Sequence, residues 1–140
     1  MYLQSYINKK PNWFRFIPVL SRPVANAMYP YIFLPKIVYD NLTSDRPNPK
    51  YIALLTHEQT HYERQQTVGA FLYALKYLLS QRFRQREELL GVTAAISYLK
   101  QNNISVDLDN LQILDAEYLF LWPISKHYNV RELKNLYDNV

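Results

Sequence analysis

The fold of this chain is decided by residues 48–61, which read NPKYIALLTHEQTH. Asn48 is suited to be a helix N-cap, because its side chain can accept a hydrogen bond from a free backbone amide of the first turn. Pro49 fits the first helical position, where its missing N–H costs nothing. The sequence therefore predicts a helix that begins at Pro49 and carries both His57 and His61.

Three helices are predicted over the middle of the chain. Helix-forming residues continue from this start to residue 100 with little interruption, and Gly69 is the expected break. We expect helices over about 49–66 and about 68–80, and a third from about Phe83 through Leu99.

The first third of the chain is predicted to be strands and loops. Its prolines forbid a long helix and favour extended segments; they are Pro11, Pro18, Pro23, Pro30 and Pro35. Residues 29–39 are rich in β-branched and aromatic side chains, which favour a strand. We expect an edge strand at Ile32–Val38, because prolines are tolerated at sheet edges, and a loop over Asp40–Asn48.

The last third completes one domain over residues 1–140. We expect a loop over residues 101–109, a helix that ends or bends at Pro123, and a short terminal helix that begins near Asn129. The predicted fold class is therefore α+β and predominantly helical, with a small N-terminal β-sheet and a helical core.

Composition excludes several kinds of function. The chain has no cysteine, so disulfides, thiolate metal sites and cysteine nucleophiles are excluded. Its two glycines are too few for a phosphate-binding loop or a dinucleotide fingerprint. The net charge of +4 is spread along the chain and predicts no specific nucleic-acid partner. With neither a signal peptide nor a bilayer-length apolar run visible, we expect a cytoplasmic protein without a membrane span.

The pentad HEQTH at residues 57–61 is an HExxH motif. On a helix, His57 and His61 lie on one face with Cβ atoms about 5–6 Å apart, so both imidazoles can bind one tetrahedral ion. Around the helix axis, Glu58 lies about 100° from His57 and about 60° from His61. It is therefore placed to act as a general base on water that the ion activates. Gln65, one turn beyond His61, is a candidate hydrogen-bond partner for the ligands.

The wider arrangement resembles the gluzincin class of zinc peptidases, in which a downstream glutamate is the third ligand. The pentad is followed by a helical hairpin and by Glu88, 27 residues after His61. Gln65, Gly69, an aromatic-rich segment and an Arg-rich lead into Glu-Leu-Leu-Gly make residues 30–100 similar to small metallopeptidases of bacterial and phage genomes. Gly91 and Leu90 depart from that pattern, which has a small alanine and often a second acid there.

The resemblance implies a minimal zincin-like domain that binds one Zn²⁺ per chain and hydrolyses peptide or protein substrates, with a phage-encoded origin as one possibility. It implies that His57, His61 and a glutamate hold the zinc and that Glu58 is the catalytic base. By the same analogy, the strand Ile32–Val38 would run beside the active-site helix and bind an extended peptide.

Glu87 and Glu88, the two candidate third ligands, fall on different faces of the predicted helix. Glu88 shares a face with three apolar residues, Val92, Ala95 and Leu99. Glu87 falls instead on the less apolar face that carries Gly91, Ala94 and Tyr98. The pattern favours Glu88 as the third ligand and keeps Glu87 as the alternate. Either acid is also explained by the helix dipole, which favours negative charge in a first turn.

Two further questions stay open at the level of sequence. A peptidase needs a group that stabilises the developing oxyanion; the candidates are Tyr118, His127, Tyr98 and the arginines Arg82, Arg84 and Arg86. The alternative to a peptidase is a zinc-stabilised structural or binding module without activity, in which the metal only ties helices together.

Overall fold

The computed structural model of the chain describes residues 3–17, 25–105, 135 and 138–139. In these ranges it contains a small sheet, a short 3-10 helix and four α-helices. The elements, in chain order, are β1 (Ile7–Lys9), η1 (Asn12–Phe16), β2 (Asn26–Met28), β3 (Tyr31–Leu34), α1 (Lys36–Leu42), α2 (Pro49–Val68), α3 (Ala70–Leu79) and α4 (Gln81–Gln101).

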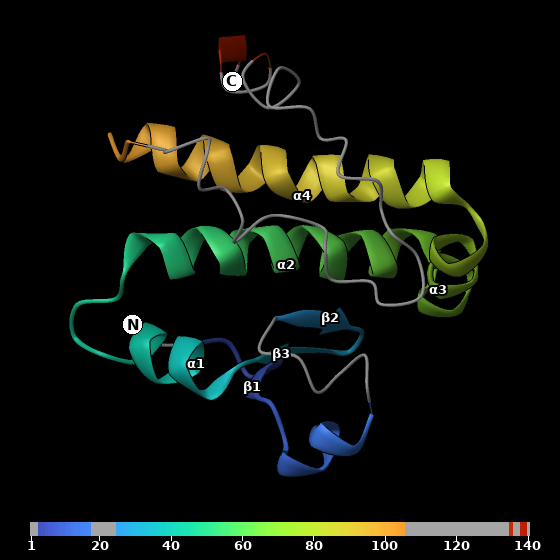
Figure 1. Cartoon of the computed structure of the whole chain (residues 1–140), viewed down its shortest axis with the longest axis horizontal. Helices are drawn as coiled ribbons and strands as arrows, with labels where there is room; N and C mark the ends of the chain where they lie inside the picture. The colour runs from blue at the N-terminus through green and yellow to red at the C-terminus, as the bar shows by residue number, and fades with distance from the viewer. Residues whose placement is uncertain (1–2, 18–24, 106–134, 136–137, 140) are drawn as a thin grey trace.

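The long helix α2 is the centre of the fold. Figure 1 shows α2 running between the sheet on one side and α4 on the other, with the short α3 joining α2 to α4 at one end. The molecule is therefore α+β and predominantly helical, as predicted from the sequence. None of the described helices is long and apolar enough to cross a bilayer.

The sheet corrects one prediction. Its strand order is β1-β3-β2, with β1 parallel and β2 antiparallel to β3. The predicted edge strand at Ile32–Val38 is thus wrong in two ways: β3 ends at Leu34, and it lies in the middle of the sheet with Ile32 opposite Ile7 and Ala27. A strand paired on both sides has no free edge for a peptide, so the expected strand addition at β3 is excluded.

Helix α1 occupies residues that were expected to be strand and loop. Pro35 precedes it, and the Lys36 ammonium group donates a hydrogen bond to the Asp40 carboxylate one turn later. Val38 and Leu42 are buried at helical spacing, whereas the β-branched composition of this segment had favoured a strand. Packing of that buried pair against the sheet outweighs the local propensity, so the loop begins only after Leu42.

The helices from α2 to α4 follow the predicted pattern closely. The Asn48 side chain accepts a hydrogen bond from Lys50 N, and Pro49 begins α2. The break is at Gly69, whose φ of 89° is a conformation that glycine adopts without strain. The third helix begins two residues before Phe83, because the Ser80 hydroxyl caps it by accepting from Phe83 N.

The two sides of α2 pack against different cores. Leu55 packs with Ile32, Leu34 and other buried residues of the sheet and α1. Ala53 packs on the opposite side with Ala95 and Leu99 of α4. Because α2 is covered on both sides, the polar residues that it directs toward these neighbours are buried; they are His57, Glu58, His61 and Gln65.

The predicted C-terminal elements fall almost wholly outside the described residues. This applies to the helix expected before Pro123 and to most of the one expected after Asn129. It applies also to Tyr118 and His127, two of the candidate oxyanion-stabilising residues.

Candidate metal centre

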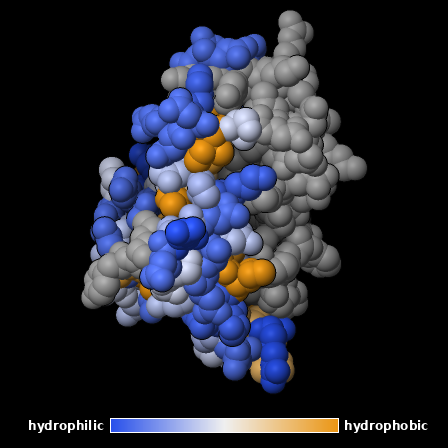
Figure 2. Space-filling model, turned by 90° about the vertical axis from the view of Figure 1, so that its left-hand side faces the viewer, coloured by the Kyte–Doolittle hydropathy of each residue, from blue (hydrophilic) through white to orange (hydrophobic). Residues whose placement is uncertain are grey.

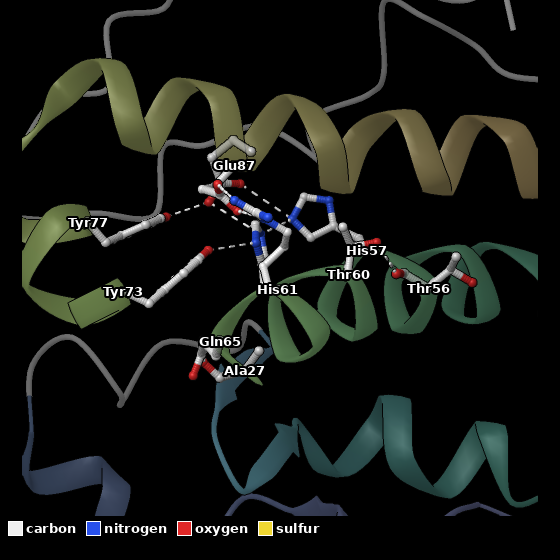
Figure 3. A network of polar contacts seen from close by, with 11 residues as sticks. Ala27, Thr56, His57, Thr60, His61, Gln65, Tyr73, Tyr77 and Glu87 are labelled. Carbon is white, nitrogen blue, oxygen red and sulfur yellow. Dashed lines mark hydrogen bonds and ion pairs between the residues drawn. The ribbon is translucent and has the colours of Figure 1, made fainter. Parts of the chain in front are cut away.

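His57 and His61 converge in the middle of α2, as the motif predicts. Their Nε2 atoms are 3.0 Å apart, and both rings are buried between α2 and α4. Figure 3 shows the two imidazoles projecting from α2 toward α4. Two zinc–nitrogen bonds of about 2.0–2.1 Å at a tetrahedral angle separate their nitrogens by about 3.3–3.4 Å, so the observed spacing suits a shared ion.

Glu88 supplies the third converging group. Its Oε2 lies 3.4 Å from Nε2 of His57, and its Oε1 lies 3.5 Å from Nε2 of His61. One ligand atom from each of the three residues lies within 4.8 Å of the others, so the group could hold a metal ion. The side chains of His57, His61 and Glu88 are 8%, 9% and 12% exposed, so the three groups are largely shielded from bulk solvent.

Glu87 is turned away to a different partner. Its carboxylate is fully buried and accepts two hydrogen bonds from Arg64, at 2.9 Å from Nε and 2.8 Å from Nη2. This bidentate pair ties α4 to α2 and neutralises the buried charge of Glu87. The geometry therefore favours Glu88 over the alternate third ligand Glu87, in agreement with the helical periodicity.

Two tyrosines of α3 fix the ligands from the side. The Tyr77 hydroxyl donates to Oε1 of Glu88, and the Tyr73 hydroxyl lies 3.1 Å from Nδ1 of His61. When Nε2 of His61 binds a metal ion, the ring proton lies on Nδ1, and the Tyr73 oxygen is placed to accept a hydrogen bond from it. Both rings point from α3 into the site in Figure 3.

Gly91 makes room for the His57 ring. A Cβ at this position would lie 2.8 Å from Cε1 and from Nδ1 of His57. Within the described residues Nδ1 of His57 has no hydrogen-bond partner, so the ring is oriented by packing against the α4 backbone and by its Nε2 contacts. A residue as small as glycine is therefore required one turn after Glu88.

The electrostatics of the centre favour a bound cation. Burial disfavours the imidazolium form of His61, but attraction and hydrogen bonding to Glu88 outweigh it and raise the pKa of His61. Burial also disfavours the Glu88 carboxylate, yet His61 and His57 hold the pKa of Glu88 well below its usual value. The same field favours any positive charge between the three residues, whether a proton or a metal ion.

Glu58 is buried beside the centre. Its charge helps raise the pKa values of His61, Tyr73 and Tyr77, although burial is the larger cause for both tyrosines. Glu58 also attracts Lys10, which follows β1, but burial is stronger and lowers the pKa of Lys10 to about 8. Glu58 is thus a buried carboxylate whose charge acts on His61, as the charge of a general base at this centre would.

The remaining predicted site residues lie elsewhere. Gln65 Nε2 donates to Ala27 O and Gln65 Oε1 accepts from Tyr29 N, so its amide binds the outer edge of β2. Tyr98 packs with the Ala53 cluster, ten residues beyond Glu88 and therefore about 15 Å along α4. Arg82 and Arg86 are exposed, and Arg84 donates to carbonyls of α3.

Four residues that support the metal centre were given no role in it by the sequence analysis: Arg64, Tyr73, Tyr77 and Gly91. Tyr73 and Tyr77 are one helical turn apart, and this spacing indicated a shared face. Among thirteen tyrosines the spacing alone did not identify them. Arg64 follows His61 by three residues on α2. Its partner Glu87 lies 23 residues away on α4, so the pair depends on the packing of the two helices and no local pattern indicates it.

Comparison of the chain with known protein families, curated proteins and solved structures finds no match. The gluzincin resemblance therefore remains a prediction, and the argument for function rests on the centre itself.

Proposed function

We propose that this chain is a zinc-dependent peptidase that hydrolyses peptide bonds with Glu58 as general base. The observation that carries the proposal is the convergence of His57, His61 and Glu88 on one point, within 4.8 Å of one another, beside the buried Glu58. The motif supplies two ligands and the base, and α4 supplies the third ligand. This is the ligand number that catalytic zinc sites have.

The donor set fits zinc better than magnesium or calcium. Two imidazole nitrogens and one carboxylate are typical ligands of catalytic zinc, whereas magnesium and calcium prefer oxygen ligands alone. The hydrogen bonds that Tyr73 and Tyr77 make to His61 and Glu88 give the second layer of support common around such sites. No cysteine competes for the metal in this chain.

Zinc in this position supplies a Lewis acid that polarises the scissile carbonyl and lowers the pKa of a water molecule. Glu58 accepts the proton of the attacking water and passes it to the leaving amine. Tyr73 keeps His61 in the tautomer whose Nε2 is a ligand, and Tyr77 orients the Glu88 carboxylate. Arg64 neutralises Glu87, so that only one carboxylate from α4 faces the centre.

The enclosure of the centre favours one other function, a zinc-stabilised module without activity. None of the three ligand side chains is more than 12% exposed, as in structural metal sites that tie helices together. In that case Glu58 has no chemical task, and its replacement has no functional consequence.

The test compares Glu58→Gln with the wild-type protein and with Glu63→Gln, an exposed glutamate on the same helix. Peptide-library hydrolysis, zinc content and thermal unfolding are measured on all three. We expect Glu58→Gln to lose at least about 10²-fold in hydrolysis while it keeps its zinc, and Glu63→Gln to match the wild type. A zinc-loaded wild type that cleaves no library peptide would contradict the peptidase and support the module.

A further inference from the structure

The outer face of α3 is a continuous apolar surface. Five large hydrophobic side chains of this ten-residue helix are exposed: Phe71, Leu72, Leu75, Leu78 and Leu79. At about 100° per residue they cover about 120° of the helix circumference. Phe71 and Leu79 are the most exposed of the five, at 83% and 77%. We call these five residues the α3 stripe.

The inner face of α3 is committed to the metal centre. Tyr73 and Tyr77 point toward His61 and Glu88, so the helix cannot turn its apolar face inward without releasing them. Arg84 holds the end of α3 by donating to the carbonyls of Tyr77 and Leu78. The α3 stripe is thus held outward by contacts on the opposite side of the same helix.

The charged residues of α3 and of the first turn of α4 are all basic. Residues 64–86 contain five basic residues and no acidic one. Of these, Lys76, Arg82 and Arg86 are exposed on and directly after α3. The two acids that follow, Glu87 and Glu88, are directed inward to Arg64 and the histidines. The exposed charges on α3 and at the beginning of α4 are therefore positive.

The opposite end of the molecule has a different surface. Figure 1 places α1 and the start of α2 at the end away from α3. Figure 2 views the molecule from that end and shows a mainly hydrophilic face with small, separate hydrophobic patches. The surface of α3 and the beginning of α4 thus differs from that of the α1 end of the molecule.

We propose that the α3 stripe docks on an anionic lipid surface, with Lys76, Arg82 and Arg86 at the level of the headgroups. An amphipathic helix with an apolar face and basic flanks lies in the membrane interface in this way. Anionic headgroups attract the flanking cations, at about fivefold in affinity for each basic residue near the surface. A second copy of the chain would instead bring the same positive charges close to one another.

The test is co-sedimentation of the full chain with vesicles. Vesicles of phosphatidylcholine mixed with phosphatidylglycerol are compared with vesicles of phosphatidylcholine alone. We expect preferential binding to the anionic vesicles, which weakens as the salt concentration rises from about 0.1 M to about 1 M and the Debye length falls from about 10 Å to about 3 Å. The binding does not depend on zinc or hydrolysis, so it is tested separately from the proposed peptidase.

Three variants sharpen the result. The triple variant Phe71→Ser/Leu75→Ser/Leu79→Ser should lose at least about tenfold in vesicle binding. Arg82→Gln/Arg86→Gln keeps the apolar stripe and should lose most of the preference for anionic lipid. The control Ile37→Ser removes a residue of α1 that is 69% exposed and should bind like the wild type.

Circular dichroism establishes that each variant retains its helices. The proposal is overturned if the folded triple variant binds as tightly as the wild type, or if the wild type does not sediment with anionic vesicles at low salt. It is also overturned if the wild type is a dimer in solution that the triple variant dissociates, because a second copy then covers the α3 stripe.

Discussion

Replacing Gly91 by alanine should damage the metal centre although the substitution adds only one methyl group. In an open helical position, alanine stabilises by about 0.5–1 kcal/mol relative to glycine. Here the new Cβ would lie 2.8 Å from two atoms of the His57 ring, and ordinary contacts are about 3.5–4.0 Å, so the ring must retreat by about 0.7 Å or more. Overpacking of this kind costs about 1–3 kcal/mol, which outweighs the gain from helix propensity.

The displacement also exceeds what the ligand geometry tolerates. Zinc–ligand distances vary by about 0.2 Å, so a ring moved by about 0.7 Å no longer shares the ion with His61 and Glu88. We expect Gly91→Ala to bind zinc at least about tenfold more weakly. In the metal-free state it should be about 1 kcal/mol less stable than the wild type.

Chelator competition measures the zinc affinity, and urea unfolding of the metal-free protein measures the stability. Ala94→Gly is the matched control on the same helix, and we expect it to lose about 0.5–1 kcal/mol of stability at unchanged zinc affinity. If Gly91→Ala binds zinc like the wild type and gains stability, the contact between α4 and His57 does not constrain the centre and the reasoning is wrong.

Three more predictions follow from the contacts of the centre. Arg64→Ala leaves Glu87 buried without a counter-charge and should lower the free energy of unfolding by about 3–5 kcal/mol in urea denaturation, whereas Arg64→Lys should recover part of it. Tyr73→Phe removes the hydrogen bond at Nδ1 of His61 and should weaken zinc binding by about 10–100-fold in chelator competition, while the exposed-residue control Leu72→Ala leaves it unchanged. In the metal-free protein, attraction to Glu88 outweighs burial and raises the pKa of His61, so the stability gained from protonated His61 is complete below the ordinary value of 6.5 and is lost as the pH rises through the folded value. Because zinc must displace the same proton, the rise in melting temperature on zinc binding should increase with pH over that interval. A rise that does not depend on pH would contradict the assignment of His61 as a ligand.

Local chemistry was sufficient for the helical part of the fold. Asn48 and Pro49 define the start of α2 through capping, and Gly69 ends it through its positive φ. Both effects act within a few residues, so the sequence expresses them directly. The same holds for His57 and His61, whose shared face follows from the helical repeat alone.

Long-range packing decided the features that the sequence analysis missed. Residues 36–42 have β-branched side chains but form α1, because Val38 and Leu42 bury against the sheet at helical spacing. The buried pairing of Glu87 depends on Arg64, which lies 23 residues earlier on another helix. The separation between partners in such contacts varies freely, so no local pattern reveals them.

The most direct test of the central claim is the metal content of the purified chain, measured by elemental analysis together with that of Glu88→Gln and Glu87→Gln. The account predicts one zinc per wild-type chain, loss of zinc in Glu88→Gln and retention in Glu87→Gln, because only Glu88 faces the histidines. A wild-type protein that takes up no zinc, or a Glu88→Gln variant that keeps a full complement, would contradict it.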